Sequence, residues 1–271
     1  MTVRLSPKRL EPRALRRHVL HMAHKGQSVH VPCAFSLIEI LSVLYSKFVR
    51  CNPRDPRDPG RDYMVLSKGH GVMAAYACFR EFGWLSQKQL DRYFSDGSLL
   101  RGLSEADIPG LEVTSGSLGH GLPVAVGIAF GLKLKKLKQR VYCVVGDGEL
   151  NEGSMWEAIM FAAHSRLDNL TVIVDANGFQ AMGTTESILN MEPLREKFAA
   201  FGFAAAECDG HDVAALEKSI SGLQRQGNLP QALIARTIKG KGLSFMEADN
   251  TWHYTRVSDA TLARALKELA D

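Results

Sequence analysis

The chain has 271 residues, of which 45% are hydrophobic and 23% charged, a composition ordinary for a soluble globular protein of one large domain or two small ones. The net charge of +4 is too small to indicate a nucleic-acid partner, and we interpret the basic stretch at 133–140 as the solvated end of a helix. No uncharged segment reaches transmembrane length, the start lacks an apolar signal-peptide core, and the five cysteines lack C-x-x-C spacing, so we expect a cytoplasmic protein without membrane contact or a disulfide framework.

The first half of the chain predicts helices followed by one strand and an irregular region. Two helices are expected at 10–24 and 35–49, and a Pro- and Asp-rich loop follows at 52–62. A short strand at 63–67 ends at Lys68-Gly69-His70. Further helices are expected at 71–82 and 86–94, the second capped by Ser86, before a glycine-rich segment at 95–118.

The second half alternates strands with helices. Strands are expected at 141–146, 171–175, 203–207 and 231–237, and helices at 123–138, 153–166, 192–200 and 212–225, the last capped by Asp212. The loop at 178–190 has the composition of a functional segment. This alternation predicts an α/β fold, a parallel sheet with helices on both faces, which we expect to form a single domain over 1–271.

Two of these strands end in residues that bind cations. The first runs into Gly146-Asp147-Gly148 and the second into Asn177-Gly178. Parallel sheets bind phosphorylated cofactors at the carboxyl ends of their strands, and carboxylate and amide oxygens suit Mg²⁺. Each motif alone is more often a simple Asp-Gly or Asn-Gly turn. Their occurrence together, after consecutive strands, favours a metal and diphosphate site.

The surrounding motifs resemble those of one family. The run G-D-G-E-L-N-E-G-S-M-W-E-A, with F-A-A-H, L-D-N-L and V-D-A-N-G-F downstream, resembles transketolase, and more narrowly the N-terminal subunit of a transketolase split into two chains. The resemblance extends from about Leu15 to His253. It implies the thiamine diphosphate-binding fold, thiamine diphosphate as cofactor, and Mg²⁺ (or Ca²⁺ or Mn²⁺) as its metal.

The resemblance also implies site residues. The metal ligands would be the Asp147 carboxylate, the Asn177 amide oxygen and the Phe179 carbonyl. The groups that contact the cofactor would be His70, Gly116, Leu118, Gly146, Asp147, Gly148, Glu149, Asn177 and His253. The catalytic residues would be His30, His70, His253 and Glu152, with Glu152 placed at the subunit interface. The remaining histidines are expected to be structural.

Four positions depart from the family pattern. S-V-H-V-P-C replaces S-G-H-P-G-G, so Val29 and Cys33 stand where glycines are usual, and Leu103 replaces a histidine that faces the donor. Met182 stands where an acidic residue is common. The cofactor site is therefore expected to be intact and the substrate site altered, which predicts an atypical ketose donor or acceptor, a sugar or a sugar phosphate.

The same resemblance predicts a partner. Full-length transketolases have pyrimidine-binding and C-terminal domains, which we expect here on a separate chain in a heterotetramer. The expected activity is transfer of a two-carbon ketol unit from a ketose to an aldose. The alternatives are the α subunit of a 2-oxo-acid dehydrogenase, a deoxyxylulose-phosphate-synthase-like condensation, and a scaffold subunit without catalytic activity.

Overall fold

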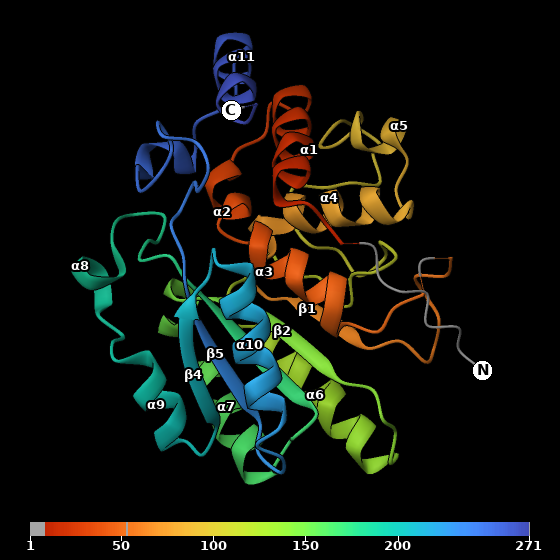
Figure 1. The fold of residues 1–271 in the computed structure, drawn as a ribbon, viewed down its shortest axis with the longest axis vertical. Helices are drawn as coiled ribbons and strands as arrows, with labels where there is room; N and C mark the ends of the chain where they lie inside the picture. Colours follow the sequence, from red (N-terminus) through yellow and green to blue (C-terminus); the bar gives the residue numbers. More distant parts are fainter. Residues whose placement is uncertain (1–8, 53, 271) are drawn as a thin grey trace.

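The computed structural model describes residues 9–52 and 54–270, so most of the N-terminal segment considered for a signal peptide, and Pro53 of the 52–62 loop, lie outside the described residues. Five parallel strands form one sheet in the order β1-β2-β3-β5-β4 (Figure 1). Their bounds are β1 Tyr63–Leu66, β2 Val141–Gly146, β3 Leu170–Ala176, β4 Ala204–Asp209 and β5 Gln231–Arg236. The predicted α/β fold with a parallel sheet is confirmed.

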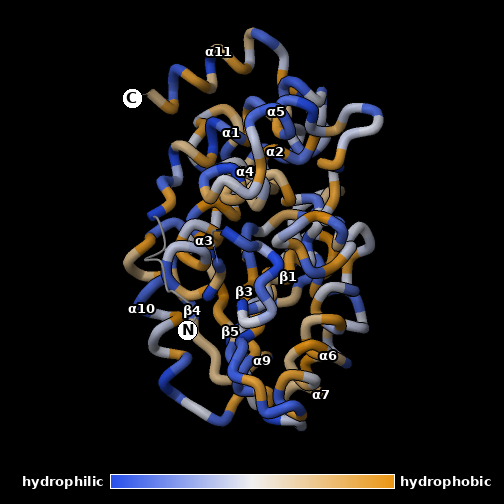
Figure 2. Tube along the Cα trace, turned by 90° about the vertical axis from the view of Figure 1, so that its right-hand side faces the viewer, coloured by the Kyte–Doolittle hydropathy of each residue, from blue (hydrophilic) through white to orange (hydrophobic). Residues whose placement is uncertain are grey.

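The helices cover both faces of this sheet. Their bounds are α1 Pro12–Lys25, α2 Val31–Phe35, α3 Ile38–Val43, α4 Val72–Phe82, α5 Gln87–Leu90, α6 Gly121–Leu134, α7 Gly153–His164, α8 Thr185–Leu189, α9 Leu194–Ala200, α10 Val213–Gln224 and α11 Asp259–Glu268. The core on one face is built with α1, α3, α4 and α10, and the core on the other face with α6, α7 and α9. Figure 2 shows the hydrophobic residues that run along α6 and α7.

The strands divide their side chains between these two cores because successive residues point to opposite faces. In β2, Tyr142 and Val144 belong to the first core, while Val141, Cys143 and Val145 belong to the second. All six residues of β2 are buried, which is typical of a central strand in a parallel sheet. Cys143 is accordingly a small core residue, as its position in the strand predicts.

Some element boundaries differ from those expected. In place of the single helix expected at 35–49, the structure has the end of α2, which begins earlier at Val31, then α3, and then a wider π-helical turn at Leu44–Phe48. The sequence did not predict these breaks, because a continuous apolar run contains no boundary signal. The helix expected to reach residue 138 ends at Leu134, shortly before Lys136 adopts a positive φ of 54°. The helix expected at 86–94 is shorter in the structure, where α5 has four residues, but the predicted Ser86 cap is present.

Two helices were not expected at all. The segment at 178–190 includes α8, which Thr184 caps by accepting a hydrogen bond from the Ser187 amide. Near the C-terminus, α11 begins after Ser258, which caps it in the same way. Both caps are readable signals for a helix start. Among residues 9–52 and 54–270, no helix combines the length and apolarity that crossing a bilayer requires.

Candidate active site

The two motifs expected to bind a metal meet at one edge of the sheet. Strand β2 pairs with β3 so that Gly146 lies opposite Asp175, which brings Asp147 and Asn177 to neighbouring strand ends. Asp147 Oδ2 accepts a hydrogen bond of 2.6 Å from the Gly178 amide, and Oδ1 accepts one of 2.8 Å from the Gly148 amide. The Asp147 carboxylate therefore connects the two loops.

The electrostatics of Asp147 favour a bound cation. Burial, and then the charge of Asp175, raise the pKa of Asp147 to about 6. A divalent cation at this position would relieve that penalty by stabilising the charged carboxylate. In the part of the chain that the structure describes, no three His, Cys, Asp or Glu side chains form a metal cluster. A cation here would need amide, carbonyl and phosphate oxygens beside Asp147, which are the donors expected for Mg²⁺ with a diphosphate.

Asp175 is a site residue that the sequence reasoning missed. Its carboxylate is fully buried and forms an ion pair with Lys68 at the end of β1. It also accepts hydrogen bonds from the Ser36 hydroxyl at 2.6 Å, from the Asn177 side-chain Nδ2 at 3.2 Å and from the Thr237 hydroxyl. These bonds orient the Asn177 Oδ1, which accepts from the Phe179 amide at 3.0 Å. The signal was available, since Lys68 and Asp175 each end a predicted strand.

Gly148 and Glu149 shape the backbone where the diphosphate is expected. A Cβ on Gly148 would lie 2.6 Å from Gln180 Cγ, so a larger residue here would require the Gln180 side chain to shift. The buried Glu149 carboxylate accepts hydrogen bonds from the Ser67 hydroxyl, the Gly119 amide at 3.0 Å and the Gly146 amide at 3.1 Å. Both Glu149 oxygens are thus used to hold three separate segments together.

Three expected histidines come together beside this edge. The ring centroids of His30 and His253 are 5.0 Å apart, those of His30 and His70 are 5.5 Å apart, and those of His70 and His253 are 6.2 Å apart. His30 adopts a left-handed φ of 68°, and its amide donates to the His253 carbonyl at 3.1 Å. A non-glycine residue held in this conformation is a strained position of the kind found at functional sites.

All three imidazoles are neutral near pH 7. Burial first, and then the charge of Lys239, lower the pKa of His30 to about 4 and that of His253 to about 3. Burial and the charge of Lys68 hold the pKa of His70 well below its usual value. Neutral imidazoles can each donate one hydrogen bond and accept another, which suits contact with sugar hydroxyls.

Lys239 and Cys33 also border the histidine cluster. Lys239 is buried, and its Nζ lies 2.7 Å from His253 Nδ1 and 5.6 Å from the centre of the Phe179 ring. Cys33 Sγ lies 3.8 Å from the same Nδ1. Cys33 is expected from the sequence only as a departure from the family pattern, and Lys239 is not among the expected site residues. The lysine is the third residue after the end of β5, and Lys68 is the second residue after the end of β1.

The remaining expected residues lie on the exposed rim. Gly116, Leu118 and Glu152 are exposed, and Glu152 immediately precedes α7. Leu103 Cδ1 would lie 3.0 Å from a Cβ on Gly116, so the substituted leucine does line this rim. Met182 is 84% exposed. These positions are open to solvent in the isolated chain, as residues at a subunit boundary would be.

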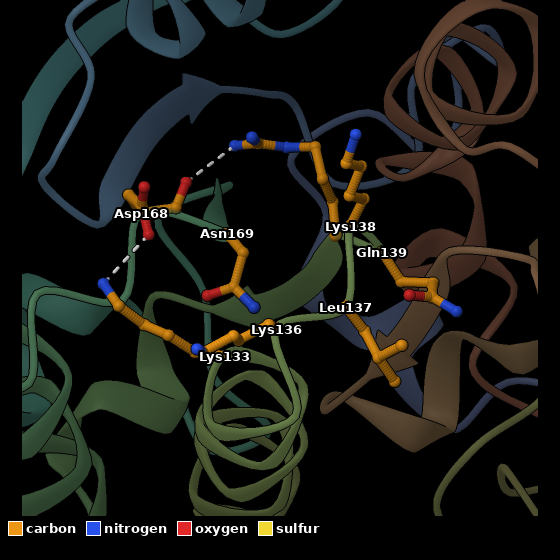
Figure 3. Close-up of a pocket in the computed structure, with 8 residues that line it drawn as sticks. Lys133, Lys136, Leu137, Lys138, Gln139, Asp168 and Asn169 are labelled. Atoms are coloured by element: carbon orange, nitrogen blue, oxygen red, sulfur yellow. Dashed lines mark hydrogen bonds and ion pairs between the residues drawn. The ribbon is translucent and has the colours of Figure 1, made fainter.

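The basic stretch forms a separate cavity at the opposite edge of the sheet. It is lined by Lys133, Lys136, Leu137, Lys138, Gln139, Arg140, Asp168 and Asn169 (Figure 3). Arg140 and Asn169 immediately precede β2 and β3, so this cavity lies at the amino ends of the strands, away from Asp147. Lys133 pairs with Asp168 at 3.1 Å and donates to the Arg166 carbonyl, which supports the interpretation of these lysines as part of a helix end.

Comparison with known proteins gives the same answer as the geometry. Residues 10–270 match the family model of the transketolase thiamine diphosphate-binding domain. One subunit of the apulose-4-phosphate transketolase of Actinobacillus succinogenes is 39% identical over 261 residues, which are 96% of this chain and 94% of that protein. The 6-deoxy-6-sulfo-D-fructose transketolase subunit SqwG of a Clostridium species is 37% identical over 243 residues, or 89% of this chain and 88% of that protein.

A solved transketolase from Campylobacter jejuni superposes with a TM-score of 0.89 at 28% identity, covering all of this chain and 43% of that one. These matches confirm the expected resemblance and favour transketolase over the 2-oxo-acid dehydrogenase alternative. With the converging strand ends and the histidine cluster, they show that the chain belongs to the transketolase family, as a subunit formed by the thiamine diphosphate-binding domain.

Proposed function

We propose that this chain and a second subunit together transfer a two-carbon ketol unit from a ketose or ketose phosphate to an aldose. The observation that carries the proposal is the hydrogen bond from the Gly178 amide to Asp147, which joins the two motifs into one oxygen-lined site. The relatives named as individual transketolase subunits support it, since their chains have nearly the same length as this one.

In this proposal Asp147, the Asn177 amide oxygen and the Phe179 carbonyl hold Mg²⁺, and the backbone at Gly146 and Gly148 faces the diphosphate. Thiamine diphosphate, when bound, supplies the carbanion that carries the ketol unit, so no nucleophilic side chain is required. Gly116 and Leu118 contact the rest of the cofactor. Glu149 acts through the backbone, because its oxygens already hold Ser67, Gly119 and Gly146 in place.

The histidines act on the substrate. His30, His70 and His253 are neutral and adjacent, so they can hold sugar hydroxyls and move protons at those oxygens during cleavage and formation of the carbon–carbon bond. His70 and His253 also border the cofactor position. His253 is buried and His30 and His70 are half-buried, which limits access of water to the reacting atoms.

We propose a cytoplasmic heterotetramer in which the partner subunit carries the pyrimidine-binding and C-terminal domains. The exposed position of Gly116, Leu118 and Glu152 supports this, because residues proposed to contact the cofactor or the partner are accessible to solvent in the isolated chain. Glu152 would lie at the interface between the two subunits and link the two active sites.

The substrate is proposed to be an atypical ketose. Leu103 offers no hydrogen bond at the rim where it contacts Gly116, and Cys33 fills space beside His253. The relatives act, by their names, on apulose-4-phosphate and on 6-deoxy-6-sulfo-D-fructose, which are not the sugars of ordinary transketolase. A donor panel tests this point, and xylulose 5-phosphate as the best donor would contradict it.

The central experiment uses the chain with and without its partner subunit. Ketol transfer is expected only when both subunits, thiamine diphosphate and Mg²⁺ are present, and chelation of the metal should remove it. Substitution Asp147→Asn should abolish cofactor-dependent activity in the complex. Full transfer by this chain alone, or by the complex without the cofactor, would refute the proposal.

A further inference from the structure

Lys239 is surrounded by three hydrogen-bond acceptors. Its Nζ lies 2.6 Å from Asn250 Oδ1, 2.7 Å from His253 Nδ1 and 3.4 Å from the Gln180 carbonyl. The side chain is buried, with 1% of its surface exposed. An ammonium group has three N–H donors and no acceptor, so each of these three neighbours must accept one hydrogen bond from Lys239.

The orientation of Asn250 is fixed independently. Its Nδ2 donates to the Ala181 carbonyl at 3.0 Å, which turns Oδ1 toward Lys239. The amide therefore presents an acceptor to the lysine, in agreement with the donor count. The third N–H of Lys239 donates to His253 Nδ1, so that nitrogen must be an unprotonated acceptor with a free lone pair. The ring proton of the neutral imidazole must therefore reside on Nε2.

The backbone on both sides of Lys239 is held by other segments. The Ile238 amide donates to His211 Nε2 at 2.8 Å, and the Gly240 amide donates to the Pro32 carbonyl at 3.1 Å. The Lys239 carbonyl accepts from the Ala248 amide at 2.9 Å. These bonds leave the lysine little freedom to turn away from His253.

We propose that Lys239 is a positioning residue that fixes His253 in its Nε2–H tautomer and so sets the direction in which this ring donates a hydrogen bond. No hydrogen bond from the described residues reaches His253 Nε2, so its proton is available to an oxygen atom of a ligand. The inference deepens the proposed function, and it relies on that proposal only for the identity of the ligand.

Cys33 is the competing explanation for the tautomer. Its Sγ lies 3.8 Å from His253 Nδ1, at a distance where a thiol is at most a weak donor. Because the lysine is closer and donates from an ammonium group, it should determine the tautomer. Removal of the thiol should therefore leave the ring unchanged, whereas removal of the amine should not.

The test is a long-range ¹H–¹⁵N spectrum of the full chain labelled with ¹⁵N-histidine, recorded without cofactor or partner at neutral pH. The His253 signals are assigned by their loss in His253→Gln. His211 is an internal reference of the opposite tautomer, because its Nε2 accepts from Ile238 and its Nδ1 bonds to Glu39 at 2.9 Å. Wild-type His253 should show a protonated Nε2 and an unprotonated Nδ1.

In Lys239→Met, the Nδ1 and Nε2 signals of His253 should shift toward an exchange average of the two tautomers, while Lys239→Arg should restore the wild-type pattern. Lys241→Met, at a neighbouring lysine that pairs with Glu247, and Cys33→Ala should leave the signals in place. An unchanged His211 pattern shows that the variants fold.

A wild-type His253 protonated on Nδ1 would overturn the inference, and so would a Lys239→Met spectrum identical to wild type. Neither result depends on ketol transfer. If the wild-type chain shows the Nε2–H tautomer but its complex with the partner subunit transfers no ketol unit, the proposed function is contradicted and the inference about His253 is not. The two failures can therefore be told apart.

Discussion

At the scale of single residues, Asp147 combines two properties that rarely coexist in a stable protein. Its carboxylate is buried and lies near a second buried carboxylate, Asp175, and burial first, then the charge of Asp175, raise the pKa of Asp147 to about 6. Among the described residues, Lys68 forms its ion pair with Asp175 and not with Asp147. A divalent cation would balance these negative charges, and the cofactor diphosphate would then bind to the cation.

Substitution Asp147→Asn should remove Mg²⁺-dependent binding of thiamine diphosphate while the chain stays folded, because the amide keeps the shape of the side chain but loses the charge that attracts the metal. Isothermal titration of the complex with the cofactor and Mg²⁺ measures this. Asp96→Asn, at an exposed loop position, is the matched control and should bind normally. Retained binding in Asp147→Asn would contradict the assigned ligand.

The lowered pKa values of His30 and His253 predict how the free energy of unfolding depends on pH. The pKa values of about 4 for His30 and about 3 for His253 lie below the unfolded value of 6.5, so the unfolded chain binds more protons between these limits. The free energy of unfolding is therefore unaffected by these two groups above pH 6.5. It decreases as the pH falls below 6.5, by up to about 1.4 kcal/mol per pH unit for each group. Asp147 acts in the opposite direction from pH 6 to 3.8, since its pKa is raised.

The net effect is that the free energy of unfolding of the cofactor-free chain should decrease from pH 7 to pH 5. Urea denaturation at several pH values measures it. His30→Gln should reduce the slope, because one titrating group is removed. A stability that stays constant over this range, or rises toward pH 5, would show that these histidines are not held neutral by the fold.

At the scale of elements, local sequence signals set where several helices begin. Asp212 Oδ1 accepts from the Ala214 amide at 2.8 Å and the Ala215 amide at 3.1 Å, which caps α10 as predicted. Ser86 caps α5 with a reciprocal bond to Gln89. Such caps satisfy amide groups that have no partner within the helix.

Asp212→Ala should lower the free energy of unfolding by about 1 kcal/mol through loss of this cap, without effect on cofactor binding in the complex. The measurement is equilibrium denaturation by urea. Lys218→Ala, in an exposed position of the same helix, is the control and should change stability by only a few tenths of a kcal/mol. Equal effects of the two substitutions would contradict the capping role.

At the scale of the whole molecule, one layer of the fold is more apolar than a surface layer needs to be. The helix α6 has the sequence G-L-P-V-A-V-G-I-A-F-G-L-K-L, with a single charged residue, and Val124 on it is 43% exposed. On the adjacent α7, Met160 is 52% exposed. A helix that is hydrophobic on all sides is normally buried, so we expect this layer to be covered in the assembled enzyme.

Val124→Asp and Met160→Asp should therefore weaken assembly with the partner subunit by at least tenfold, because burial of a carboxylate costs several kcal/mol. Val124 lies in the first turns of α6, where a negative charge is tolerated by the helix, so the isolated chain should stay folded. Sedimentation velocity of the mixed subunits measures the assembled fraction. Lys218→Asp, on α10 at the other face of the sheet, should assemble normally, and equal weakening there would refute this interface.

The sequence by itself determined the parallel α/β architecture and the β2 and β3 strand ends that carry Asp147 and Asn177, whereas His30, His70 and His253 were expected from the family resemblance. These depend on local patterns: apolar runs of strand length, glycines beside oxygen ligands, and motifs of fixed spacing. The break in the helix expected at 35–49 could not be read in this way, because a buried apolar run looks the same whether or not it is interrupted.

Only the tertiary structure decided how Lys68 pairs with Asp175 and how Lys239 meets His253. The first contact depends on strand order, because β1 lies beside β2 and β2 beside β3, so that Lys68 and Asp175, far apart along the chain, reach the same edge. The second contact depends on how the segment after β5 folds back on itself, since Lys239 and His253 both lie in that segment. Strand order follows from the packing of both sheet faces at once, which no short segment of sequence contains. The buried charges around the site are therefore a property of the whole fold.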